Sequence, residues 1–524
     1  MMVFKITKGG EIIMKKIASK LSCVLFAVFL CFIAMKTHPA QAFDLDLYGK
    51  PISVTGYIKQ NVGYNVYGGN NWDTKRDVEN AFFEFLTEAA YNPTPILKLF
   101  ASGRINTDWT YLLYNNNDEW RDKEFDDSES ELYFFGDGED ILHEANISWA
   151  PGNFFFRLGK QVVKWGQTDG FRLMDQINPV DQRRGMLDIE FESTILPIWL
   201  FRGEYKVPVT FMDSLDLQFV FNPNIHHRPN EGIKLGTQEG GVWTPRVDVP
   251  LGGPYPFDYA RIGSYNWNIE DPDGSDGFEY AFKMQASFWD SIASLNYYYG
   301  RDKDPIYLYD GNDTFTTSPW DQRMVIHPGV TGYYARTRFV GGTFSRDIPR
   351  LSSSALGGVA PTFRVEAFYA FDNTFRLDHG NQLHESDELR VAIGADWKVK
   401  INLLNPKAYF MISPQWYLRR IMDFPSNDHL WSASEDYLCE NNQITTVLIN
   451  TTYLHTKLTP SIFWMRNWTQ KNYMWKYELS YSPTHKWKYA LGALYVGGDS
   501  DADDKGLTTF DRKDQVYVTV RYNF

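Results

Sequence analysis

The sequence predicts an all-β protein: a single transmembrane antiparallel up-and-down β-barrel of about 16 to 18 strands. Three observations favour this fold: an N-terminal export signal, segments of about ten residues in which apolar and polar side chains alternate, and connections of alternating length. Such alternation is typical of strands with one face towards lipid and one towards water.

The N-terminal segment has the three parts of a secretory signal peptide. A basic stretch over residues 15–20 precedes an apolar run over residues 21–35 and an Ala-Gln-Ala cleavage site. The apolar run is shorter than the roughly 18 residues that a membrane helix needs. We expect residues 1–42 to be removed, with Met14 as the alternative start, which leaves residues 43–524 as one barrel domain.

Removal of this signal leaves an acidic chain. The signal holds six lysines and one glutamate, so 46 of 52 basic and 64 of 65 acidic residues remain, a net charge of −18. A chain with this balance is a poor partner for nucleic acid, which needs a basic face. Only Cys439 of three cysteines remains, and the chain has no C-x-x-C motif. We therefore expect no internal disulfide, no haem or zinc site, and no cofactor.

Period-two alternation recurs along the chain in segments rich in aromatic residues. Between residues 278 and 288 one file is apolar throughout: Phe278, Tyr280, Phe282, Met284, Ala286 and Phe288. The opposite file is more polar: Glu279, Ala281, Lys283, Gln285 and Ser287. A soluble β-sandwich also alternates, but aromatic residues at the strand ends favour the interfacial girdles of a membrane barrel.

The connections between these segments favour a barrel over a sandwich. Short ones with turn residues lie at 92–95, 150–153, 289–291 and 482–485, and long polar ones at 109–137, 166–193, 222–277 and 302–330. The exceptions are a longer connection at 347–361 and a short one at 468–471. We expect short turns on the periplasmic side and long extracellular loops.

The C-terminal segment explains how such a sheet closes. Lipid offers no partner to backbone polar groups, so a spanning sheet must have no free edge. We expect the last strand, apolar at alternate positions up to Tyr522 and Phe524, to pair with the first at about 54–64. This terminus also resembles the C-terminal signal of bacterial outer-membrane proteins, which implies recognition by the barrel assembly machinery.

A barrel of this size has room for an aqueous lumen, which a connection after the fifth strand can narrow. This connection, residues 159–186, carries charges of both signs: Asp169, Arg172, Asp175, Asp181, Arg183 and Arg184. Opposed rows of such charges create a transverse field that selects small solutes. The alternative is an exterior loop whose charges pair with each other or with water. A helical turn over residues 171–176, ended by Asn178-Pro179, is expected.

Strand parity adds further candidates for the wall of the lumen: Lys283, Arg364, Glu366, Arg390 and Arg521. On the lipid face a Lys or Arg would cost about 2 to 4 kcal/mol at mid-membrane depth, which favours inward placement.

The connection also carries a family resemblance. The run from Gly159 through Trp165-Gly166, followed by Asn-Pro-Val-Asp at 178–181 and Arg183 or Arg184, resembles a segment of outer-membrane proteins of the domain of unknown function 1302 family. The resemblance implies a barrel for envelope transport, with hydrophobic or lipid-like compounds as solutes. It implies no catalytic residues.

Metal and enzyme sites have weaker support. The alternate carboxylates Asp499, Asp501 and Asp503 begin like a calcium loop but lack its glycine, so a solvated acidic loop is favoured. The chain has no G-x-S-x-G, H-E-x-x-H or phosphate-binding loop, and we expect no enzyme.

Two functions follow from these features. The first is a porin-like channel in the bacterial outer membrane that passes small solutes. The second is a barrel that works through a periplasmic partner in lipid or electron transfer. Steady single-channel currents would distinguish the first from the second.

Overall fold

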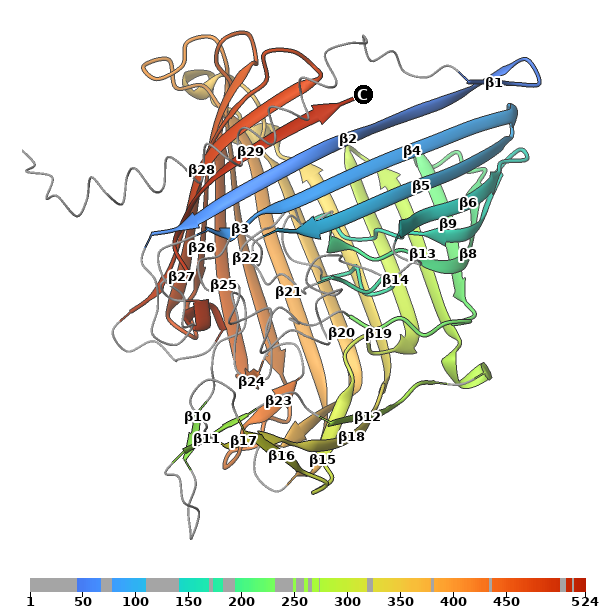
Figure 1. The fold of residues 1–524 in the computed structure, drawn as a ribbon. Helices are drawn as coiled ribbons and strands as arrows, with labels where there is room; N and C mark the ends of the chain where they lie inside the picture. Colours follow the sequence, from blue (N-terminus) through green and yellow to red (C-terminus); the bar gives the residue numbers. More distant parts are fainter. Residues whose placement is uncertain are drawn as a thin grey trace, which may run out of the picture.

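The protein forms one closed antiparallel β-barrel (Figure 1), as the sequence predicts. The main sheet of the described residues has 22 strands; four of these are three-residue pieces, which leaves 18 long strands around the barrel. The count is the upper end of the predicted range. The computed structural model describes residues 45–66, 78–109, 141–168, 173–181, 194–230, 248–250, 259–262, 266–272, 274–317, 324–377, 381–432, 436–499, 506–510 and 513–524.

Most of the 18 long strands have eight to thirteen residues, which is the length needed for a tilted strand to cross a bilayer. They are β2 (Lys50–Asn65), β4 (Phe82–Thr94), β5 (Leu97–Asp108), β6 (Leu142–Trp149), β7 (Phe154–Gln161), β8 (Ile198–Val207), β9 (Ser214–Asn222), β13 (Glu279–Phe288), β14 (Ser291–Arg301), β19 (Arg336–Asp347), β20 (Thr362–Leu377), β21 (Leu383–Val399), β22 (Phe410–Ile421), β25 (Asn441–Asn450), β26 (Leu458–Asn467), β27 (Asn472–Tyr481), β28 (Trp487–Gly498) and β29 (Gln515–Asn523). The short pieces are β1 (Leu45–Leu47), β3 (Val78–Asn80), β23 (Leu430–Ser432) and β24 (Asp436–Leu438).

The barrel closes between β2 and β29, which lie side by side in Figure 1. Ile58 is opposite Tyr522 in this antiparallel pair. The backbones of Gly56 and Phe524 exchange two hydrogen bonds, with N···O distances of 3.1 and 3.0 Å. Because every long strand therefore has two neighbours, the ring of 18 long strands has no free edge.

The two faces of the wall differ as the alternation predicts. In β13, Phe282 is exposed on the outside, whereas Glu279 and Ala281 are buried on the inside. In β14, Tyr297 is exposed while Tyr298 is 1% exposed. Outward rings also pack across strands: the ring centroids of Phe219 in β9 and Phe282 in β13 lie 4.9 Å apart. The outer face is therefore apolar and aromatic, and the described residues contain no helix long and apolar enough to cross a membrane.

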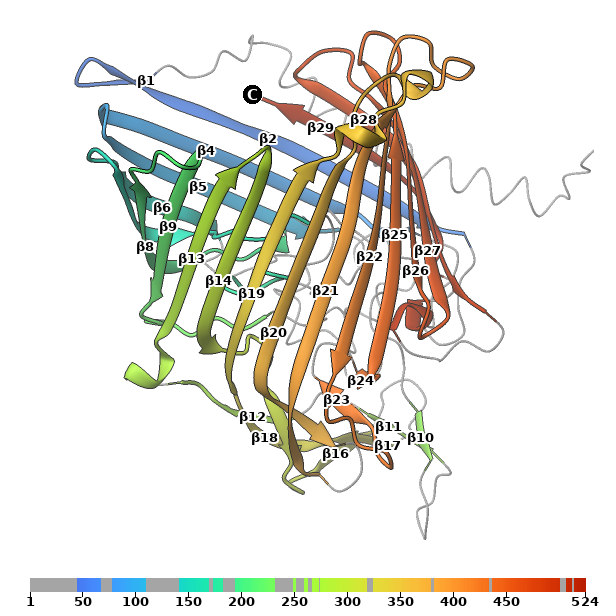
Figure 2. The same cartoon turned by 180° about the vertical axis from the view of Figure 1, so that it is seen from behind.

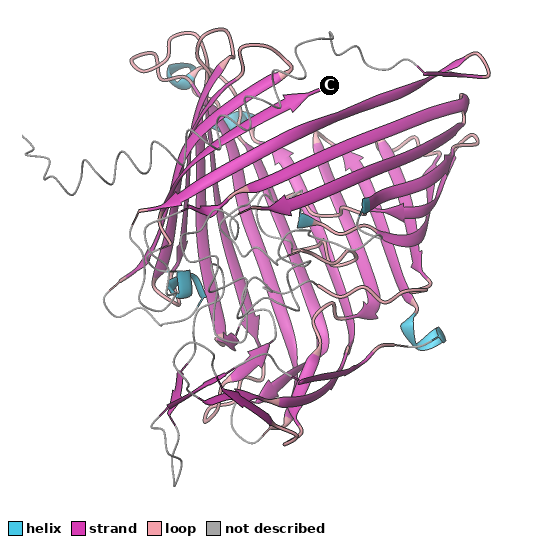
Figure 3. Cartoon of the chain, viewed as in Figure 1, coloured by secondary structure: helices cyan, strands magenta, loops and turns pink. Residues whose placement is uncertain are grey.

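The two ends of the barrel differ in their connections. Residues 150–153, 208–213, 289–290 and 482–486 make short links at one end. Long connections leave the other end, where two small sheets gather (Figures 1 and 2). These sheets contain β10 (Asp248–Pro250), β11 (Tyr259–Ile262), β16 (Thr314–Thr317) and β17 (Met324–His327), and β12 (Asn266–Glu270), β15 (Ile306–Tyr309) and β18 (Gly329–Tyr333). The helices are short pieces outside the wall strands (Figure 3).

Removal of Phe524 is expected to leave little protein in the outer membrane. The Phe524 backbone supplies part of the closing seam, and its ring stacks on Phe85 with centroids 6.1 Å apart. Without it, the last pair of the seam is lost and strand edges stay unpaired for longer. The measurement is the amount of heat-modifiable protein in outer-membrane fractions. Phe315→Ala, which alters an exposed ring in β16, serves as the control; normal levels of the truncated protein would contradict the assembly role.

Candidate functional site

The connection from β7 to β8 packs against the inner face of the barrel. It contributes apolar side chains to a buried cluster, here called the luminal cluster. The other members of this cluster come from seven wall strands: β8, β9, β13, β14, β19, β20 and β21. The members from the connection are Val163, Trp165, Leu173, Met174 and Ile177; those from the wall are Ile198, Leu200, Val220, Ala281, Tyr298, Phe339, Phe368, Ala370 and Ala392. Because Ala281 and Tyr298 alternate with exposed outward residues, this cluster lies inside the barrel.

Asn178 ties the two ends of this connection together. Its Oδ1 accepts a hydrogen bond from the Val163 N–H at 2.8 Å, and its Nδ2 donates to the carbonyl oxygens of Gln161 at 3.1 Å and Leu196 at 3.0 Å. The side chain is 2% exposed, so these bonds satisfy an otherwise costly buried amide. The Asn-Pro-Val-Asp motif that carries the family resemblance therefore has a structural role.

The predicted charges of the connection have different outcomes. Asp175 is turned onto its own loop, where its Oδ1 accepts hydrogen bonds from the backbone N–H groups of Trp165 and Gly166. The Asp181 N–H donates to the Thr194 carbonyl oxygen at 2.7 Å, next to the bridge between Val180 and Ile195. The other four candidates lie outside the described residues: Asp169, Arg172, Arg183 and Arg184.

The expected helical turn over residues 171–176 is wrong for the part that the structure describes. Residues 173 and 174 form a bend, and residues 175 and 176 have no regular secondary structure. Leu173 and Met174 are 1% and 0% exposed in the luminal cluster. Their positions are therefore fixed by packing against the barrel wall and not by local helical hydrogen bonds.

Two wall charges hold the same connection from the opposite strand β20. Glu366, which is fully buried, accepts hydrogen bonds at Oε1 from the N–H groups of Gln167 and Thr168, the latter at 2.6 Å. Arg364 donates through Nη1 to the Gln167 carbonyl oxygen and through Nη2 to Asp396 at 2.9 Å. The alternation of residues along the strand predicts that both side chains lie on the inner face. The structure shows in addition that both hold the backbone of the β7–β8 connection.

The other parity candidates also lie on the inner face. Lys283 is opposite Gln218 and Asn296 in the ladder. Arg521 lies with its guanidinium carbon 3.8 Å from the centre of the Tyr57 ring. Their role in the passage of solutes remains a prediction.

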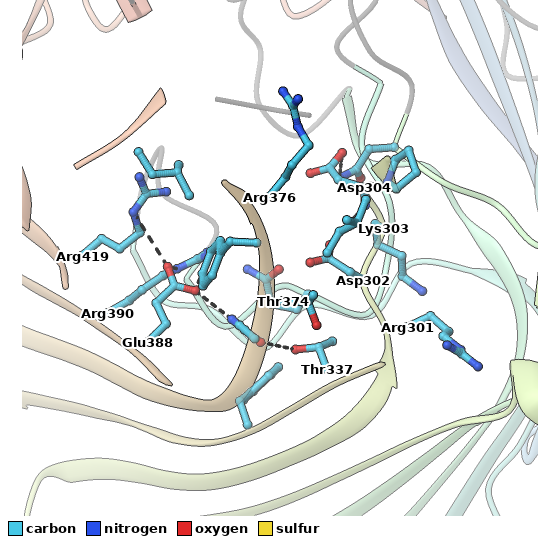
Figure 4. A pocket seen from close by; sticks show the side chains of 18 of the residues that line it. Arg301, Asp302, Lys303, Asp304, Thr337, Thr374, Arg376, Glu388, Arg390 and Arg419 are labelled. Atoms are coloured by element: carbon cyan, nitrogen blue, oxygen red, sulfur yellow. Dashed lines mark hydrogen bonds and ion pairs between the residues drawn. The ribbon is translucent and has the colours of Figure 1, made fainter. Parts of the chain in front are cut away.

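Arg390 belongs to a polar pocket inside the barrel at the end with the long connections (Figure 4). Glu388 lines this pocket; it is 1% exposed and receives two hydrogen bonds from Arg390 at 2.8 and 3.0 Å. Arg419 lies 3.8 Å from the same carboxylate, and Asn373 donates to it at 2.9 Å. Gln176 and Asn178 of the connection line the same pocket, so the folded-in loop forms part of its wall.

Sequence reasoning missed several charged residues of this pocket: Arg301, Lys303, Arg376, Glu388 and Arg419. Glu388 and Arg390 share one strand face, so parity could have found the carboxylate. Arg376 had no such signal, because β20 changes register between Ala370 and Asn373 and Asp372 has a left-handed φ of 51°. A bulge of this kind changes the face on which the following residues lie.

Two titratable groups near the pocket lie outside the spanning strands. Burial raises the pKa of the Asp302 carboxyl, so its charged form is disfavoured. Burial, with a smaller contribution from nearby Lys303, lowers the pKa of His227 to about 4. The imidazole is therefore neutral at neutral pH and adds no positive charge there.

The weak calcium candidates gain no support. Both carboxylate oxygens of Asp499 accept hydrogen bonds from Arg466, one at 3.1 Å, which occupies the positions that a metal would need. Asp501 and Asp503 lie outside the described residues. The described part of the chain contains no group of three side chains arranged to hold a metal.

Comparisons with solved structures return outer-membrane porins of low sequence identity. Pseudomonas aeruginosa OccK8 (OprE) is 10% identical with a TM-score of 0.44, over 90% of this chain and 98% of that chain. Acinetobacter baumannii OccAB3 is 9% identical with a TM-score of 0.44, over 90% and 99%. An anion-selective porin from Comamonas acidovorans is 11% identical with a TM-score of 0.37, over 91% and 100%.

No curated protein matches the chain significantly. A family model does: the one described as protein of unknown function (DUF1302) matches residues 33–524. This match covers nearly the whole chain and agrees with the barrel, whose closed sheet and apolar outer face are those of an outer-membrane protein. The chain therefore belongs to the DUF1302 family of proteins of unknown function.

Proposed function

We propose that the protein is a porin-like channel of the bacterial outer membrane, with the described parts of the β7–β8 connection, residues 162–168 and 173–181, narrowing its lumen. The observation that supports this most directly is the clamp of Glu366 and Arg364 on the backbone of Gln167 and Thr168. A loop held against the inner wall reduces the open cross-section and brings its polar groups near the path of a solute.

The inner wall favours small polar or charged solutes over the lipid-like compounds that the family resemblance implies. Its described charges include Lys59, Glu84 and Arg104 near the seam, and the group around Glu388. The apolar side chains of the luminal cluster pack against each other, so they do not form a continuous apolar surface along the lumen.

The test is the single-channel current of the purified protein in a planar lipid bilayer. Steady, repeated current steps in potassium chloride are expected, because a barrel of 18 long strands has room for an aqueous lumen that conducts ions. A folded, heat-modifiable barrel that conducts no current and copurifies with a soluble periplasmic protein would instead support the partner-dependent function.

A further inference from the structure

Arg376, near the end of β20, is a buried cation with an unusual environment. Its side chain lines the pocket, the residue is 4% exposed, and its Nε has no hydrogen-bond partner among the described residues. Three aromatic rings surround the guanidinium: its central carbon lies 4.4 Å from the ring centre of Trp431, 5.0 Å from that of Tyr309 and 5.3 Å from that of Tyr307.

The other cations of the pocket each have a carboxylate. Arg390 and Arg419 share Glu388, and Lys303 contacts Glu279 at 2.7 Å. Arg301 contacts Asp276. Figure 4 shows Arg376 apart from the group of Glu388, Arg390 and Arg419, with its guanidinium directed away from the Glu388 carboxylate.

The rings offset only part of the cost of burying this charge. Stacking of Arg on aromatic faces stabilises the cation, but it does not supply an acceptor to the N–H donors in the guanidinium plane, of which the buried Nε–H of Arg376 has no partner among the described residues. A buried donor without a partner is destabilising, and a carboxylate can accept two N–H groups of one guanidinium at once. The geometry of Arg376 is therefore suited to an anion that is absent from the chain itself.

We propose that Arg376, with Tyr307 and Trp431, binds the carboxylate of a small organic anion that carries a flat apolar body. Such a body would lie against the edges of four largely buried rings that also line the pocket: Tyr298, Phe339, Phe368 and Phe375. The pocket lies between the β7–β8 connection and the end of the barrel that carries the long connections. A solute that enters the barrel from that end would meet the pocket before it reaches the narrowed part of the lumen. This inference deepens the proposed function by naming its solute class, and its role in transport rests on that function.

The test uses benzoate as the anionic probe and benzamide as its neutral analogue of the same shape. Isothermal titration of the full-length, detergent-folded protein is expected to show benzoate binding and at least about tenfold weaker benzamide binding, the size of effect expected when a charge-assisted contact is lost. Equal binding of the two compounds, or no benzoate binding, would overturn the inference without any variant.

Arg376→Gln is expected to weaken benzoate binding at least about tenfold, and Arg376→Lys, which keeps the charge but loses the fork of donors, to weaken it less. Heat-modifiable gel mobility verifies that each variant is folded. Arg338→Gln is the matched control, because Arg338 also lies over a ring, Phe371 at 5.7 Å, but is exposed and paired with Asp372. Unchanged benzoate affinity in folded Arg376→Gln would contradict the assignment.

Bilayer currents separate this inference from the proposed function. A conducting channel whose current benzoate reduces in the wild type, and reduces less in Arg376→Gln, supports both. Benzoate binding to a barrel that conducts no current would retain the anion site and reject the channel. Conductance without benzoate binding would retain the channel and reject the site.

Discussion

Replacement of residues 164–176 by a short glycine-serine linker is expected to raise single-channel conductance at least about twofold, because current depends on the open cross-section at the narrowest point. The linker removes Trp165, Leu173 and Met174 from the lumen and the backbone groups that Glu366 and Arg364 hold. Asn178 is kept, so the ends of β7 and β8 remain connected near their present positions. Planar-bilayer recordings at fixed salt provide the measurement.

A deletion of similar size at the other end of the barrel tests whether the loss of residues alone changes the conductance. The connection between β19 and β20 includes Leu351, which is 55% exposed, and shortening it over residues 351–358 is expected to leave conductance unchanged. If the variant without residues 164–176 folds and has the conductance of the wild type, the connection does not narrow the path of ions.

Glu84→Gln is expected to lower the free energy of unfolding by about 3 to 5 kcal/mol, because it removes a buried charge that two cations share. The Glu84 carboxylate is fully buried in β4 and accepts hydrogen bonds from Tyr57 at 2.8 Å and Arg104 at 3.0 Å. Lys59, on the neighbouring strand β2, lies 3.3 Å away. Since β2 is also the strand that closes the barrel, loss of this group weakens the wall beside the seam. The measurement is denaturant-induced unfolding in lipid vesicles.

Glu88→Gln is the control for this change. Glu88 lies on the same strand and the same face, and it has no ion pair within the described part of the chain. It is expected to alter stability by less than about 0.5 kcal/mol. Equal effects of the two substitutions would show that the shared carboxylate of Glu84 is not the cause.

The local pattern of the chain is enough to predict the wall of the barrel. Each spanning strand alternates because one face is apolar and the other is not, and this period is visible in residues such as Tyr280 and Ala281 without any knowledge of their neighbours. Closure of the barrel can also be predicted from the sequence, since lipid tolerates no free sheet edge and the C-terminal strand has one apolar and one polar face, like the first strand. Arg364, Glu366 and Arg390 were placed on the inner face by the same parity.

The contents of the lumen depend on contacts between residues far apart in the sequence. No local pattern reveals that Glu366 accepts hydrogen bonds from residues nearly 200 positions earlier, or that Asp175 accepts hydrogen bonds from the backbone of its own loop. Parity also fails beyond the bulge at Asp372, so the position of Arg376 among three rings from other connections was not predictable. The sequence by itself determined which face the residues of the regular spanning strands occupy, because alternation is a property of the extended chain. Only the tertiary structure decided which charges meet inside, because closing the sheet brings distant strands and loops into one enclosed space.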